Sequence, residues 1–211
     1  LVPPDRRCFA FFHPAMPNDP LIFVEVALGK GLAESIQDIL ASPRELVPAE
    51  KADTAIFYSI SNCHKGLAGI SFGAFLIKQV ASDLKAELPN LKTFATLSPV
   101  PGLSKWMKER KISDALLSKS EDLVTAAAAY LAEAKNPSGH PRDPVARFHL
   151  SNGAELYRIN AGADVSAKGL AQSHGVMVNY LYELDRVEAR HEAFAATAEL
   201  ALSRDVSNLL N

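Results

Sequence analysis

The sequence has few features of secreted, membrane-spanning or nucleic-acid-binding proteins. Its two cysteines, Cys8 and Cys63, form no disulfide framework and lack the spacing of metal ligands. No apolar run approaches the roughly 20 residues of a transmembrane helix, and the start lacks a basic-then-apolar secretory pattern. The 22 basic and 24 acidic residues nearly cancel, so no global field would hold nucleic acid or an anionic membrane. We expect a soluble protein of a reducing compartment.

The motifs of several common enzyme classes are missing as well. Neither a Walker loop nor a dinucleotide fingerprint occurs, which disfavours nucleoside triphosphates and NAD as ligands. The absence of a G-x-S-x-G elbow argues against an α/β-hydrolase. No two histidines lie at ligand spacing with a carboxylate, so we expect no metal site.

The order of apolar patterns predicts one domain of 211 residues with a mixed α/β sheet flanked by helices. Strand-like runs at 54–60 and 91–97 are joined by a helical pattern at 72–88. This βαβ unit predicts that its two strands are parallel. Further strands are expected at 154–161 and 176–184.

The two ends and the middle of the chain carry other patterns. Runs at 8–12 and 21–28 flank a Pro/Asn/Asp cluster at 13–20 and predict a hairpin, which a helix at 31–40 follows. Residues at about 103–143 are mostly helical and interrupt the strand pattern as an insertion. Residues 186–210 predict one terminal helix.

A glycine-rich segment between the strand and the helix of the βαβ unit is the first candidate binding site. Residues 66–73 would present backbone N–H groups at the positive end of a helix, which suits a pyrophosphate. Read alone, the same glycines are explained more simply by close packing of helix on strand.

Ser98 and His149 are the two candidate catalytic residues. Ser98 ends a strand and is followed by two prolines in three residues, which would aim its hydroxyl. His149 lies in a short apolar stretch that predicts partial burial, and a buried imidazole can be poised near neutral pH. Read alone, they are more simply a turn serine and a hydrogen-bonded structural histidine. Ser59 and Tyr182 lie on strand-like runs, where a hydroxyl points into a cleft, the core or solvent.

Four polar residues are interleaved with apolar ones near the last strands. They are Arg158, Asn160, Asp164 and Asn179. This pattern predicts a hydrogen-bonded scaffold rather than a catalytic set.

Read together, many segments resemble malonyl-CoA decarboxylase over nearly the whole chain. The segments that carry the resemblance are 6–9, 55–61, 66–69, 75–78, 97–102 with Lys105 and Trp106, 144–154, 158–160, 163–166 and 178–182. So many matches in order are more specific than any one motif. Because the catalytic domain of that family has the fold of the GNAT acetyltransferases, the resemblance implies a GNAT-like, partly antiparallel sheet.

The resemblance also assigns residues to the site. It implies that Ser98 and His149 are catalytic and that Ser59 and Tyr182 are further active-site hydroxyls. The substrate-binding acyl-CoA loop falls on Ala68, Gly69, Ile70, Ser71, Phe72, Gly73 and Ala74, with Ser98 and His149 completing the site. Ser71 departs from the pattern, because animal members carry a glutamate there. The segment between Trp106 and Pro144 is also shorter than in animal relatives.

The activity implied by the resemblance is decarboxylation of malonyl-CoA to acetyl-CoA and CO2 through a thioester enolate that is protonated at carbon. Coenzyme A is part of the substrate, and no separate cofactor is expected. We expect His149 to deliver the proton and Ser98 to be its hydrogen-bonded partner. Two alternatives stay open, an acyl-CoA-dependent N-acetyltransferase and a non-catalytic CoA-thioester-binding module.

Assembly and location follow from the same resemblance. The family has an N-terminal helical domain that we expect to be absent from this chain, which starts at Leu1. A homo-oligomer formed through that domain is compatible with the resemblance. The final residues are not a Ser-Lys-Leu peroxisomal address, and we expect a cytoplasmic enzyme of bacterial type.

Overall fold

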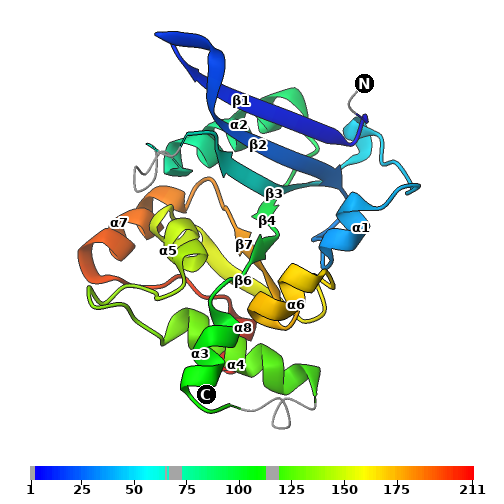
Figure 1. Cartoon of the computed structure of the whole chain (residues 1–211). Coiled ribbons are helices and arrows are strands. Elements are labelled where there is room, and N and C mark those ends of the chain that lie inside the picture. Colours follow the sequence, from blue (N-terminus) through cyan, green and yellow to red (C-terminus); the bar gives the residue numbers. More distant parts are fainter. Residues whose placement is uncertain (1–2, 65, 67–72, 113–118) are drawn as a thin grey trace.

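The computed structural model describes residues 3–64, 66, 73–112 and 119–211, which form one sheet with helices around it (Figure 1). The described strands form a seven-stranded sheet in the order β1-β2-β3-β4-β7-β5, and β6 also pairs with β7. The strands are β1 (Arg6–His13), β2 (Met16–Gly29), β3 (Thr54–Asn62), β4 (Thr93–Thr96), β5 (Ser98–Pro99), β6 (Glu155–Asn160) and β7 (Met177–Leu181).

The helices lie around this sheet and include one short 3-10 turn. They are α1 (Ile36–Leu40), η1 (Ala49–Lys51), α2 (Gly73–Glu87), α3 (Leu103–Glu109), α4 (Ser120–Ala132), α5 (Pro144–Ser151), α6 (Ala167–Ser173), α7 (Val187–Thr197) and α8 (Arg204–Asn208). None of the described helices is long and apolar enough to cross a bilayer.

A single parallel pair lies at the centre of the described sheet. β3 and β4 pair in parallel from Thr54 with Thr93 to Phe57 with Thr96, and α2 provides the crossover between them. The other described pairs are antiparallel. The predicted βαβ unit and the partly antiparallel sheet are therefore both confirmed.

The core occupies both faces of the sheet. In β2, Val24, Val26 and Leu28 belong to the larger buried cluster, and Ala27 belongs to the smaller one. This split follows from the alternation of side chains along a strand. α2 covers the larger cluster with fully buried residues at helical spacing, which are Ile77, Val80, Ala81 and Leu84.

The N-terminal hairpin is confirmed, but its turn is tighter than predicted. β1 and β2 remain paired as far as His13 with Met16, so residues 16–20 lie in a strand and not in the turn. Register shifts beside Phe11 and Phe12 accommodate the prolines of this stretch, since proline is tolerated at strand irregularities.

The predicted helix at 31–40 is wrong over its first half, because α1 starts only at Ile36. The Gly31 amide donates to Asp53 Oδ1 at 2.9 Å, and the Ile36 amide donates to the Ala163 carbonyl at 2.8 Å. These long-range partners replace the hydrogen bonds that a longer helix would make.

The predicted terminal helix is also wrong, because it is broken between α7 and α8. Ala198 adopts a left-handed conformation with φ of 55° and ends α7. The chain then runs beside β6, where the Leu156 amide donates to the Ala201 carbonyl and the Ser203 amide donates to the Leu156 carbonyl. Ser203 caps α8 through the Val206 amide. Pairing with β6 thus replaces the helical hydrogen bonds of this segment.

Asn179 of β7 is the centre of the predicted scaffold. Its side chain is fully buried and accepts from Asn160 Nδ2 at 2.8 Å and from Arg158 Nε at 3.2 Å. Its own amide donates to the carbonyls of Thr96 and Ala33 at 2.8 and 3.0 Å. The scaffold prediction is confirmed for these residues and joins β6, β7 and the end of β4. Asp164 lies outside it and accepts from Gln37 and Ser166 instead.

Replacing Asn179 by alanine should lower the free energy of unfolding by about 1–3 kcal/mol, because buried donors and a carbonyl acceptor lose their partners. Urea unfolding measures the loss. Asn90→Ala is the matched control, since the exposed Asn90 amide donates to a single carbonyl, that of Glu50. Equal effects of the two substitutions would contradict the central role of Asn179.

Candidate active site

A cavity opens where β3 and β4 part. Their pairing ends at Phe57 and Thr96, after which the Leu97 amide makes a last hydrogen bond of 3.1 Å to the Phe57 carbonyl. The chain then continues into β5, which pairs with β7, whereas residues 59–62 of β3 have β2 as their described partner. A register shift opposite Tyr58 disturbs the β2–β3 ladder at the same level. The two central strands therefore diverge and leave space between them.

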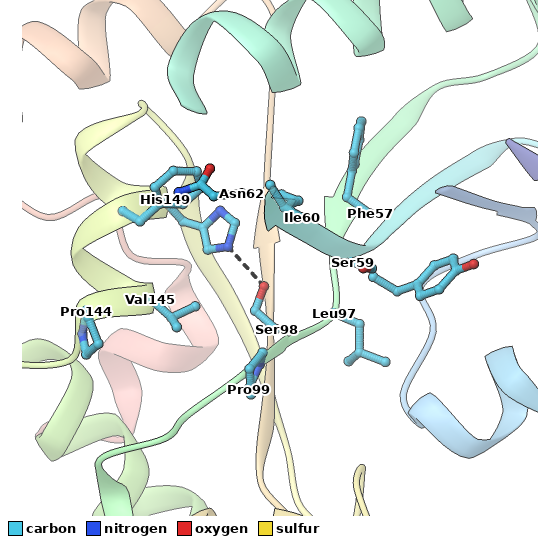
Figure 2. Close-up of a pocket in the computed structure, with 12 residues that line it drawn as sticks. Phe57, Ser59, Ile60, Asn62, Leu97, Ser98, Pro99, Pro144, Val145 and His149 are labelled. Atoms are coloured by element: carbon cyan, nitrogen blue, oxygen red, sulfur yellow. Dashed lines mark hydrogen bonds between the residues drawn. The ribbon is translucent and has the colours of Figure 1, made fainter. Parts of the chain in front are cut away.

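The cavity between the diverging strands has a volume of about 330 Å³. β3, the β4–β5 segment and α5 supply its walls. The lining residues are Phe57, Tyr58, Ser59, Ile60, Asn62, Leu97, Ser98, Pro99, Pro144, Val145, Phe148 and His149. Most of these side chains are apolar. In Figure 2, Ser98 and His149 point toward each other across this lining.

Ser98 is held at the start of β5 with its side chain facing the cavity. It is only 6% exposed, and its hydroxyl donates to Thr96 Oγ1 at 2.9 Å. Its Oγ also lies 3.0 Å from His149 Nε2. Thr96 Oγ1 accepts in turn from the Tyr180 amide at 3.2 Å, so the serine is anchored to β7 as well.

His149 lies in the last turn of α5, a helix whose start is encoded locally. Asp143 caps it by accepting from the amides of Val145 and Ala146, each at 2.9 Å, and Pro144 occupies the first turn. The helix is only eight residues long, and it places His149 at the cavity wall.

His149 is buried among aromatic rings, which disfavours the charged form of its imidazole. The side chain is 3% exposed and stacks on the Tyr180 ring with centroids 4.5 Å apart, while Phe148 approaches edge-on at 5.0 Å. Burial lowers the pKa of His149 to about 3. The expectation of partial burial is therefore wrong. Full burial moves the pKa away from neutral pH, because the aromatic surroundings remove the water that would stabilise a positive charge.

Tyr182 completes a hydrogen-bonded relay behind the histidine. It follows β7 directly, is 2% exposed, and places its hydroxyl 2.8 Å from His149 Nδ1. Burial raises the pKa of Tyr182 well above its usual value, so the phenol keeps its proton. Because Ser98 donates to Thr96, its oxygen accepts from Nε2–H, and Nδ1 is then free to accept from Tyr182. We call Thr96, Ser98, His149 and Tyr182 the relay.

Three of the predicted site residues, Ser98, His149 and Tyr182, thus come together, and Ser59 lies nearby. Ser59 lines the cavity from β3, and among the described residues no hydrogen bond links it to the relay. Residues 68–72 of the predicted acyl-CoA loop lie outside the described residues. Gly73 and Ala74 are the first residues of α2, and the role predicted for the loop stays a prediction.

Several cavity residues were missed by reasoning from the sequence. Phe57, Ile60, Val145 and Phe148 belong to apolar runs that predict core, and only the divergence of β3 and β4 turns them into cavity walls. Asn62 was also missed, although its position as the last, exposed residue of β3, three residues after Ser59, was a usable signal. Within the described residues, no group of three or more His, Cys, Asp or Glu side chains could hold a metal ion.

The chain has a GNAT-like fold, with a Ser–His pair at the cavity between its diverging central strands. A GNAT-like decarboxylase in complex with isobutyryl-CoA superimposes with a TM-score of 0.56 at 19% identity, over 84% of this chain and 77% of that one. A family model described as the malonyl-CoA decarboxylase C-terminal domain matches residues 1–123 and 117–211. The chain belongs to the malonyl-CoA decarboxylase family, and the resemblance seen in the sequence is confirmed.

Two relatives give the extent of the match. The mitochondrial malonyl-CoA decarboxylase of Anser anser anser is 37% identical over 100% of this chain and 51% of its own length. The crystal structure of malonyl-CoA decarboxylase from Rhodopseudomonas palustris has a TM-score of 0.91 at 48% identity, over 98% of this chain and 53% of that one. The chain therefore spans about half the length of the curated relatives it matches.

The low pKa of His149 has a consequence for stability. The unfolded chain binds a proton at this histidine below its ordinary pKa of 6.5, whereas the folded protein does so only near pH 3. Wild-type stability should therefore fall as the pH drops through this window, by at most about 1.4 kcal/mol per pH unit from this residue. His149→Gln should lose less stability than wild type between about pH 7 and 5 in urea unfolding.

The control for this measurement is His13→Gln, at an exposed site beside the hairpin turn. This variant keeps His149 and should therefore keep the loss of stability that His149 causes. If His149→Gln instead shows the full wild-type slope, the imidazole is not held neutral by burial.

Proposed function

We propose that this chain decarboxylates malonyl-CoA to acetyl-CoA and CO2. The observation that carries the proposal is the relay at the wall of a mainly apolar cavity, in a chain that belongs to this family. The relatives that cover the chain are named malonyl-CoA decarboxylase. Because this chain spans about half of their length, activity of the isolated chain is part of the proposal.

The apolar walls favour loss of CO2. As the C–C bond breaks, its electron pair moves into the thioester and forms an enolate, and the negative charge leaves the carboxylate for the thioester oxygen. Phe57, Ile60, Val145 and Phe148 offer the carboxylate little hydration, whereas neutral CO2 needs none. Such a pocket disfavours the charged ground state relative to the transition state.

The relay is suited to stabilise the enolate oxygen. The Ser98 hydroxyl can turn from Thr96 to the thioester oxygen while its own oxygen still accepts from His149 Nε2–H. Tyr182 holds the ring in this orientation through Nδ1. A preorganised donor of this kind is typically worth about 3 kcal/mol in the transition state.

The charge state of His149 changes the role that we assign to it. A ring whose pKa is about 3 is not protonated at neutral pH, and a neutral imidazole N–H is a poor acid toward carbon. We therefore replace the expected proton delivery by His149 with polarisation of the thioester through Ser98. The enolate carbon takes its proton from water that enters as CO2 leaves, so the reaction consumes one proton from solvent.

An N-acetyltransferase activity is not favoured. That reaction needs a base for the acceptor amine, and the pKa of His149 is too low for this task. The relatives also carry decarboxylase names. The proposed reaction needs no cofactor besides the CoA of the substrate.

Cytoplasmic location and assembly through an N-terminal domain remain proposals. The described helices include no membrane span, and the animal relatives are named mitochondrial. Analytical ultracentrifugation of a longer chain that includes the N-terminal half found in the relatives tests the homo-oligomer.

The proposal is tested by incubating the 211-residue chain with malonyl-CoA and measuring CO2 and acetyl-CoA. We expect both products in equal amounts without an added amine. Product formation only when an amine is supplied would select an acetyltransferase. Calorimetric binding of malonyl-CoA without turnover would select a binding module, and either result would overturn the proposal.

Ser98→Ala and His149→Gln should each lower kcat by about 10²–10³-fold, because each removes the supported donor to the enolate oxygen. KM should change much less, since the donor acts mainly in the transition state. Ser61→Ala on the same strand as Ser59, but outside the cavity lining, is the control and should keep wild-type kcat. Near-normal turnover of folded Ser98→Ala would remove Ser98 from the mechanism.

A further inference from the structure

Asp143 is a fully buried carboxylate that lies six residues before His149. Its Oδ1 accepts from two amides in the first turn of α5, those of Val145 and Ala146. This contact fixes the direction and rotation of the short helix that carries the imidazole.

Asp143 also lies near residues of three other elements. Oδ2 is buried and has no hydrogen bond of normal geometry, yet the Tyr130 hydroxyl of α4 and the Gly102 amide before α3 lie close enough to favour its charged form. Burial raises the pKa of Tyr180 well above its usual value, and the charge of Asp143 adds to this effect. Tyr180 is also the ring on which His149 stacks.

Gly102 places the segment that follows Ser98 next to Tyr130 and Asp143. It lies four residues after Ser98, and the two prolines between them limit the freedom of the backbone. A Cβ built at Gly102 would lie 2.0 Å from the Tyr130 hydroxyl oxygen and 3.8 Å from Asp143 Oδ2. Only glycine permits this close approach of the segment to Tyr130 and Asp143.

We propose that Asp143 is a positioning residue that holds His149 in register with Ser98, by tying the start of α5 to the segment that follows Ser98. The inference rests on the proposed function for the importance of the Ser98–His149 pair. One oxygen orients the helix of the histidine, and the other faces the backbone that leads from the serine. A shift of about 1 Å between these segments would break the 3.0 Å contact of the pair.

Ionisation of Asp143 costs stability, although its hydrogen bonds cap α5. Burial is the largest influence on the pKa of Asp143 and raises it above the ordinary value of 3.8, against the lowering effect of the nearby amides and Tyr130. The folded protein therefore binds this proton more readily than the unfolded chain. The charged carboxylate reduces stability as the pH rises through this window. A carboxylate that costs stability at the start of α5 is expected to serve the geometry of the pair.

The test compares Asp143→Asn with wild type in the 211-residue chain. The amide oxygen of asparagine keeps the helix cap, and its NH2 group cannot accept from Gly102 or Tyr130. We expect the variant to be at least as stable as wild type near neutral pH, with kcat for CO2 release lowered about tenfold or more and KM within about twofold. Higher stability with lower kcat is a result that a purely structural role does not give.

Ser203→Ala is the matched control. Ser203 caps α8 through the Val206 amide at 3.1 Å and is nearly as buried as Asp143, but α8 carries no residue of the cavity lining. It should lower stability and leave kcat unchanged. Asp143→Ala should lower both, with a larger loss of kcat than Asp143→Asn.

A second measurement is independent of turnover. The ring nitrogens of His149, assigned in ¹⁵N spectra by comparison with His149→Gln, report its hydrogen bonds to Ser98 and Tyr182. We expect these signals to shift in Asp143→Asn and to stay in place in Ser203→Ala. Unchanged ring signals and unchanged kcat in Asp143→Asn would overturn the inference. An inactive wild type would overturn the proposed function, while the ring signals would still decide the positioning role.

Discussion

The separation of β3 from β4 is the constraint on which the rest of the structure depends. The two strands share four residue pairs and then part after Phe57, so the next residues of each face a cavity instead of each other. Backbone pairing with β2 and β7 on the outer sides keeps both strands ordered while they diverge. Ser98 and His149 meet at this point, and the walls consist of side chains that would otherwise lie in the core.

Much of the fold follows from local patterns, but the site does not. The βαβ unit was predictable because 2-residue and 3.6-residue periodicities are strong between residues 54 and 97. The contact between Ser98 and His149 joins residues 51 positions apart, and only the ordered family matches indicated it. Local reasoning about each residue favoured a structural role.

The errors have a common physical origin in long-range contacts. The terminal helix was predicted through Ala201, whose carbonyl instead accepts from Leu156 of β6. The burial of His149 was underestimated because the stacked ring of Tyr180 comes from a strand that is distant in the sequence. Partners of this kind decide both where a helix ends and whether an imidazole carries a proton, and neither is encoded in the neighbouring residues.

The pKa values of the relay residues determine how the site responds to a change of pH. Serine and threonine do not titrate in the physiological range, the pKa of His149 is about 3, and that of Tyr182 lies well above its usual value. The relay itself therefore carries the same protons at mildly acidic pH as at neutral pH. If the proposed reaction takes place here, the supply of thioester, more than the acidity of the surroundings, would set its rate.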